Sequence, residues 1–104
     1  MKVFKLVQEL KLKDKASGEE RVIAKDTEVV VYPQNHCLVG VTDIRFRIPW
    51  TTAHQYFNEV IEINDEVMGN AILDECVTVL GDPIEPDGKD HEGFPSVLIA
   101  TGIC

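Results

Sequence analysis

Apolar and polar residues alternate over the first thirteen positions, and this alternation constrains the fold more than any other feature of the sequence. The even positions carry Phe4, Leu6, Leu10 and Leu12, with Gln8 as the polar exception, whereas the odd positions are mostly polar. A period of two places alternate side chains on opposite faces of a strand, whereas a helix repeats every ~3.6 residues. The segment is therefore predicted to be a β-strand with one buried face.

Two further runs repeat this pattern. Residues 21–32 read as a second strand or a bent pair, with an irregularity at Lys25-Asp26, and residues 37–48 read as a third strand. Turn residues separate the runs at Ser17-Gly18 and at Pro33-Gln34-Asn35. Short connections join strands that run antiparallel, so we expect an antiparallel β-meander over about residues 2–48.

The middle of the chain carries the pattern of an amphipathic helix over about residues 52–63. Thr52 and Gln55 have the spacing of a capping box, and Pro49 disfavours helix before it. A helical stripe of apolar residues follows: Ala53, Tyr56, Phe57, Val60 and Ile61. Such a helix would cover the apolar face of the sheet. A second short helix near residues 65–73 is an alternative to strand, and the sequence leaves residues 64–80 open.

The end of the chain is predicted to be a C-terminal β-hairpin with a long acidic loop. Residues 76–80 and 95–103 are rich in apolar and β-branched residues, and the segment between them holds three glycines and two prolines. The expected architecture is a single α+β domain over residues 1–104, since a chain of this length forms one modest core. The longest apolar run has only four residues and excludes a membrane-spanning helix, so we expect a cytoplasmic location.

Charge is distributed very unevenly along the sequence. Residues 1–50 hold nine Lys/Arg and seven Asp/Glu, whereas residues 51–104 hold one lysine, Lys89, and eleven carboxylates. Lysines of the first strand, such as Lys11 and Lys13, are interleaved with acids, which disfavours direct nucleic-acid binding. The asymmetry favours a non-enzymatic interaction protein that docks or inhibits a basic partner, such as a nucleic-acid-handling protein.

Five carboxylates are the predicted contacts with such a partner. Glu59, Glu62 and Glu66 are spaced by three and four residues, so on one continuous helix they would form a stripe resembling a row of phosphates. Asp87 and Asp90 lie in the acidic loop. The loop has five carboxylates, but neither Gly88 nor Gly93 fits the spacing of an EF-hand, so whether it binds a cation stays open.

An alternative function is a homo-oligomeric module that binds an anionic small ligand such as a nucleotide. Arg45 and Arg47 fall on the same side of one strand, ~7 Å apart by strand rise. Trp50 and Tyr56 follow closely in sequence and would stack a base, while the arginines would bind its phosphate.

A second alternative is a metal-dependent enzyme that uses His91 and acids of the loop, but no known motif supports it. The sequence has no zinc-binding histidine spacing, nucleophile elbow or phosphate-binding loop, and we expect neither a cofactor nor a metal. Three cysteines, Cys37, Cys76 and Cys104, are too few and too widely spaced for a disulfide framework. Cys37 and Cys76 are expected to pack as small apolar residues, and Cys104 to be accessible.

Overall fold

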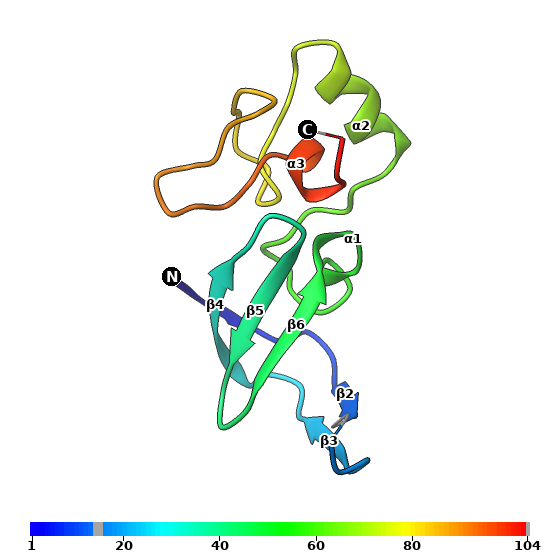
Figure 1. Ribbon diagram of the computed structural model, residues 1–104, viewed down its shortest axis with the longest axis vertical. Helices are drawn as coiled ribbons and strands as arrows, with labels where there is room; N and C mark the ends of the chain where they lie inside the picture. The colour runs from blue at the N-terminus through cyan, green and yellow to red at the C-terminus, as the bar shows by residue number, and fades with distance from the viewer. Residues whose placement is uncertain (14–15, 104) are drawn as a thin grey trace.

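The computed structural model describes residues 1–13 and 16–103 and has an α+β fold, as predicted (Figure 1). One antiparallel sheet has the order β1-β4-β5-β6. Its strands are β1 (Lys2–Lys5), β4 (Glu28–Pro33), β5 (Cys37–Val41) and β6 (Arg45–Pro49). A separate two-stranded ribbon pairs β2 (Leu10–Lys13) with β3 (Glu20–Ile23). The predicted antiparallel arrangement is confirmed, and β4, β5 and β6 form its meander.

The first predicted strand is split in two by a bulge opposite Leu6. The Leu6 carbonyl accepts from the Asp26 N–H (2.9 Å), while the Leu6 N–H donates to the Thr27 carbonyl (3.1 Å). Asp26 has a φ of 70°, the left-handed conformation typical of the first residue of such a bulge. The bulge re-aims the chain, so β1 pairs with β4 while β2 pairs with β3. The predicted irregularity at Lys25-Asp26 is thereby confirmed.

The third predicted strand is in fact a hairpin, and the single strand over residues 37–48 was wrong. The chain reverses at residues 42–44, where the Thr42 N–H donates to the Ile44 carbonyl (2.9 Å). The register pairs Leu38 with Ile48 and Gly40 with Phe46. Even positions therefore keep the same face on both sides of the turn, which is why the alternation continues through it unbroken.

The predicted helix over residues 52–63 was wrong, because α1 (Trp50–Ala53) lasts only one turn. Pro49 occupies the N-cap position, and the Thr52 hydroxyl donates to the Pro49 carbonyl and makes no capping box. After α1, the backbone of residues 56 and 57 pairs with the N-terminal segment: the Val7 N–H donates to the Tyr56 carbonyl (2.9 Å), and Leu6 forms a β-bridge with Phe57. The apolar stripe is buried by this tertiary pairing, not by a helix.

Residues 64–80, for which the sequence left helix and strand undecided, contain the helix α2 (Asp65–Ile72). Its N-cap is Asn64, whose side chain accepts from the Val67 N–H (2.9 Å). The predicted C-terminal hairpin was wrong, because α3 (Val97–Ala100) is helical and the two segments share only an isolated bridge, Thr78 to Ser96. Ser96 caps α3 by accepting from the Ile99 N–H, and all four residues of α3 are buried. Capping and burial thus outweigh the strand preference of the Val-Leu-Ile run.

The main core joins both parts of the chain. The inner face of the sheet carries Phe4, Val29, Val31, Leu38 and Ile48, and it packs against residues from the C-terminal half. That covering layer consists mainly of irregular segments and contributes Phe57, Val60, Val79, Phe94 and Ala100. A smaller cluster of Ala71, Cys76, Val97 and Leu98 lies between α2 and α3.

The molecule measures 44 × 23 × 22 Å. The β2–β3 ribbon lies at one end of the long axis, and α2 with its neighbouring loops lies at the other (Figure 1). No helix within the described part of the chain is long and apolar enough to span a bilayer. Cys76 is buried and Cys37 is half-buried, and both are free thiols, while the prediction for Cys104 falls outside the described residues.

Candidate functional site

A hollow of about 680 Å³ lies at the α2 end of the molecule, between residues 74–77 and residues 83–86. Its apolar lining residues are Cys76, Val77, Pro83, Ile84 and Pro86. Its acidic members are Asp74, Glu75 and Glu85, all of them exposed. We call this hollow the acidic groove.

The end of α2 sets the position of the first two carboxylates. The Glu75 N–H reaches back to the Asn70 carbonyl (2.9 Å), and the Leu73 N–H donates to the same oxygen (3.1 Å). Asp74 has a φ of 71°, as expected where a helix ends in a left-handed residue. The chain thus leaves the helix in a fixed direction, with the two acids following each other at the rim.

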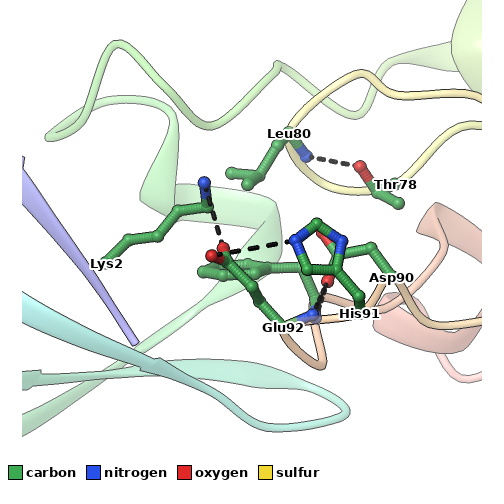
Figure 2. Close-up of polar contacts among 7 residues, drawn as sticks. Lys2, Thr78, Leu80, Asp90, His91 and Glu92 are labelled. Carbon is green, nitrogen blue, oxygen red and sulfur yellow. Dashed lines mark hydrogen bonds and ion pairs between the residues drawn. The ribbon is translucent and has the colours of Figure 1, made fainter.

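Backbone hydrogen bonds hold the two walls of the groove together. The Ile84 N–H donates to the Cys76 carbonyl (3.1 Å), and Val77 bridges to Pro83. The turn between the walls is organised by buried Thr78, whose hydroxyl oxygen accepts from the Leu80 N–H (3.2 Å; Figure 2) and from the Asp82 N–H (3.2 Å). The groove therefore rests on a well-bonded loop.

Among the described residues, no lysine or arginine forms an ion pair with a carboxylate of the groove. In the described residues, Lys/Arg ion pairs join Lys2 to Glu92 and Arg21 to Asp43, and neither involves a carboxylate of the groove. Two large apolar side chains, Ile72 and Leu73, are 67% and 75% exposed directly before Asp74. Exposed apolar residues beside unpaired charges are typical of an interaction surface.

The structure does not form the stripe predicted for Glu59, Glu62 and Glu66. Glu59 lies in a turn and Glu62 in an extended segment, and only Glu66 lies in a helix, the first turn of α2. All three are exposed, but without a continuous helix their sequence spacing no longer places them on one face. The resemblance to a row of phosphates is therefore lost.

Asp87 and Asp90 differ in what their side chains do. Asp87 is exposed. Asp90 is half-buried, and its Oδ1 accepts from the backbone N–H groups of Glu92 and Phe94 (2.9 Å each). Asp90 thus organises the turn of its own loop, a common use of this side chain, and one of its oxygens is already occupied.

Glu92 ties the acidic loop to the first strand. Its Oε2 lies 3.0 Å from the Lys2 Nζ, and its Oε1 lies 3.9 Å from the Nε2 of exposed His91 (Figure 2). Hydrogen bonding and charge attraction from Glu92 raise the pKa of Lys2 above 10.5. This contact is one link between the halves, and it removes Glu92 from the set of free carboxylates.

The predicted ligand-binding set is not brought together. Arg45 and Arg47 are exposed and line a hollow of about 650 Å³ between the β2–β3 ribbon and β6, whereas Trp50 and Tyr56 are absent from its lining. Trp50 is completely buried: its ring centroid lies 5.9 Å from that of Phe94, and its Nε1 donates to the Gln34 carbonyl (2.8 Å). The prediction that Trp50 stacks on a base was wrong, because its indole belongs to the core.

Across residues 1–13 and 16–103, no group of three or more His, Cys, Asp or Glu side chains is arranged to hold a metal ion. Comparisons with protein-family models, with curated proteins and with solved structures found no match to this chain. The acidic groove therefore stands as the candidate site on its geometry and charge alone. Sequence reasoning included Glu85 only among the five carboxylates of the acidic loop and missed Asp74 and Glu75; the available signal was the pair Asp74-Glu75 directly after the apolar pair Ile72-Leu73.

Proposed function

We propose that this chain is a non-enzymatic interaction protein that docks a basic protein surface through its acidic C-terminal half. The observation that carries the proposal is the acidic groove, in which Asp74, Glu75 and Glu85 lie beside apolar lining residues and form no ion pair with a lysine or arginine of the described chain. A lysine or arginine of the partner would meet one of these carboxylates while its aliphatic stem packs on the apolar lining residues. Such charge complementarity mainly accelerates association and selects the partner.

The exposed apolar pair Ile72 and Leu73 extends this surface beyond the charges. Interfaces draw most of their free energy from a few well-buried anchors, with charged residues at the rim. The groove supplies the charged residues and the pair Ile72 and Leu73 supplies apolar anchors. A purely solvated acidic face would lack such anchors. Asp87 directly follows the second wall of the groove and remains a proposed contact, while Glu59, Glu62, Glu66 and Asp90 stay predictions outside the groove.

Inhibition of the partner and a cytoplasmic location belong to the same proposal. The phosphate-like stripe no longer supports a nucleic-acid-handling partner, so the proposal rests on the partner's basic surface and not on what that partner binds.

The proposal is tested by affinity capture from a lysate of the native host, using the wild type and a groove variant with Asp74→Asn, Glu75→Gln and Glu85→Gln. A matched control carries Glu9→Gln, Glu19→Gln and Glu20→Gln, three exposed carboxylates of the first half, so both variants lose the same charge. We expect a basic protein to be captured by the wild type and the control but not by the groove variant, and to elute as salt rises.

The purified pair is then titrated at low and high salt to measure the dissociation constant. Equal capture by the wild type and the groove variant, or an affinity that does not change with salt, would contradict the proposal. Circular dichroism of both variants establishes that each is folded before the comparison is made.

A further inference from the structure

We propose that the open edge of β6 binds an extended acidic segment of another protein, which joins the sheet as an additional strand. The site lies beside the second hollow, which we call the basic hollow and which is lined by Lys13, Arg21, Arg45 and Arg47 together with Leu12, Ile44 and Phe46. It is at the opposite end of the long axis from the acidic groove (Figure 1), and the inference does not depend on the proposed function.

The register of the β5–β6 hairpin fixes which backbone groups are free. Two hydrogen bonds bracket the ladder: the Thr42 N–H donates to the Ile44 carbonyl (2.9 Å), and the Trp50 N–H donates to the His36 carbonyl (3.2 Å). Hydrogen-bonded and non-hydrogen-bonded pairs alternate in an antiparallel ladder. Residues 44, 46, 48 and 50 therefore bond to β5, and residues 45, 47 and 49 direct their backbone groups away from it.

The outward groups are those of Arg45 and Arg47, followed by Pro49, which has no N–H. β6 is the last strand of its sheet, and no strand of the described chain pairs with its outer side. Two N–H donors and their carbonyls, two residues apart, thus form a template for an incoming strand. Pro49 would limit the added strand at that end.

The side chains around this edge are complementary to acids. Arg45 and Arg47 project from the same face of β6, since they are two residues apart, and Arg21 and Lys13 supply two more cations from the ribbon. The ion pair between Arg21 and Asp43 is loose, because the Arg21 Nη1 lies 3.8 Å from the Asp43 Oδ2 and the Asp43 side chain is 83% exposed. Among the described residues, the four cations around the hollow therefore form one ion pair, and that pair is a loose one.

The same geometry predicts the pattern of the segment that binds. In a strand added to β6, alternate side chains would face Arg45 and Arg47, and these should be Asp or Glu. The intervening side chains would lie on the other face of the added strand, the face to which Phe46 of β6 and Ile44, directly before β6, project, and these should be apolar. The expected ligand is an extended peptide in which acidic and apolar residues alternate.

The net charge of −8 does not prevent this interaction. Charges are screened over ~8 Å at physiological ionic strength, whereas the long axis of the molecule is 44 Å. A nucleotide fits the hollow less well, because the nearest tryptophan, Trp50, is completely buried and offers no surface for stacking.

The probe is a fluorescein-labelled nine-residue peptide of alternating Glu and Val, titrated with the full chain and followed by anisotropy. A control peptide has the same composition with the glutamates in one block, and a second control carries N-methyl groups on alternate backbone nitrogens. We expect binding of the alternating peptide, a loss of about tenfold or more with the block peptide, and loss of binding on N-methylation of the edge-facing nitrogens. The variants Arg45→Gln and Arg47→Gln should each weaken binding severalfold.

Three results would overturn the inference: no binding of the alternating peptide, equal binding of the N-methylated peptide, or displacement of the peptide by a single-stranded DNA that has as many phosphates as the peptide has glutamates. The last would make the hollow a phosphate-binding site. Because the decisive comparison is between peptides on one wild-type protein, it does not depend on whether the arginine variants fold.

Discussion

Substitution of Gly40 by alanine should destabilise the protein strongly, because the ring of Phe46 occupies the space of the missing side chain. Gly40 lies opposite Phe46 in a hydrogen-bonded pair of the β5–β6 ladder. A Cβ added at Gly40 would lie 2.5 Å from Cε2 and 2.9 Å from Cε1 of Phe46, and closer still to Cζ. Phe46 is only 7% exposed, so its ring has little room to move aside.

The expected cost follows from two opposing terms. Overpacking a well-filled core costs about 1–3 kcal/mol, and displacing a nearly buried ring falls at the upper end of that range. Alanine restricts the unfolded chain more than glycine, which offsets about 0.5–1 kcal/mol. The net loss of unfolding free energy should be about 2 kcal/mol, which for a chain of this size lowers Tm by about 8–16 °C.

The assay is urea unfolding followed by tryptophan fluorescence, with Gly69→Ala as the matched control. Gly69 lies within α2, and a Cβ added there meets nothing within 4 Å, so Gly69→Ala should raise the free energy of unfolding by about 1 kcal/mol. In a Phe46→Leu background, Gly40→Ala should cost much less, because the ring is gone. A loss below about 0.5 kcal/mol for Gly40→Ala alone, or an unchanged loss in the Phe46→Leu background, would refute the reasoning.

Three further outcomes follow from local backbone and charge contacts. Asp26 and Asp74 both have left-handed backbones, with φ of 70° and 71°, so Asp→Gly at either position should stabilise by about 0.5 kcal/mol in urea unfolding, while Asp→Ala destabilises by about 1 kcal/mol. Ser96→Ala removes the oxygen that accepts from the Ile99 N–H at the cap of the wholly buried helix α3 and should cost about 2 kcal/mol by the same assay. The ion pair raises the pKa of Lys2 above 10.5, so its stabilisation is complete below that pH and is lost as pH rises through the folded-state pKa. The Tm difference between wild type and Lys2→Met should therefore hold from neutral pH to about pH 10 and shrink as the pH rises further; a difference that stays the same from about pH 10 to about pH 12 would contradict this.

The sheet could be predicted from the sequence because alternation reports which face of a strand is buried, and that face is filled as expected by residues such as Phe4, Val29 and Leu38. The turn at residues 42–44 was invisible to the same signal, because the hairpin keeps Gly40 and Phe46 in register on one face. The alternation therefore predicts faces reliably but not where a strand ends.

The helix over residues 52–63 failed for a different reason. The apolar residues of this segment do have helical spacing, and Phe57 and Val60 are buried, as they would be in an amphipathic helix. Their burial is instead achieved by a backbone bridge from Leu6, a contact across about fifty residues that no local window contains. The short α3 shows the converse case, since a cap at Ser96 and complete burial place a Val-Leu-Ile run in a helix.

The excess of acidic residues in the second half could be predicted from the sequence, but the position of the acidic groove could not. The three carboxylates of the acidic groove come from two segments, 74–77 and 83–86, which the turn around Thr78 brings together. Sequence spacing instead favoured Glu59, Glu62 and Glu66, which depended on a helix that does not form. The geometry of a site on a loop is determined by hydrogen bonds within that loop, and such bonds produce no periodic pattern of apolar and polar residues.

The position of the two charged hollows follows from how this core is built. Surface charges contribute little to stability, so the fold rests on a core that joins the sheet to Val79, Phe94 and Ala100 of the second half. The sheet end then carries the cations of β2, β3 and β6, and the far end carries the unpaired acids after α2. With the two ends separated along a 44 Å axis, each is screened from the other. A basic partner and an acidic segment can therefore each be attracted to its own end of the same molecule, so neutralising the groove should leave the basic hollow unaffected.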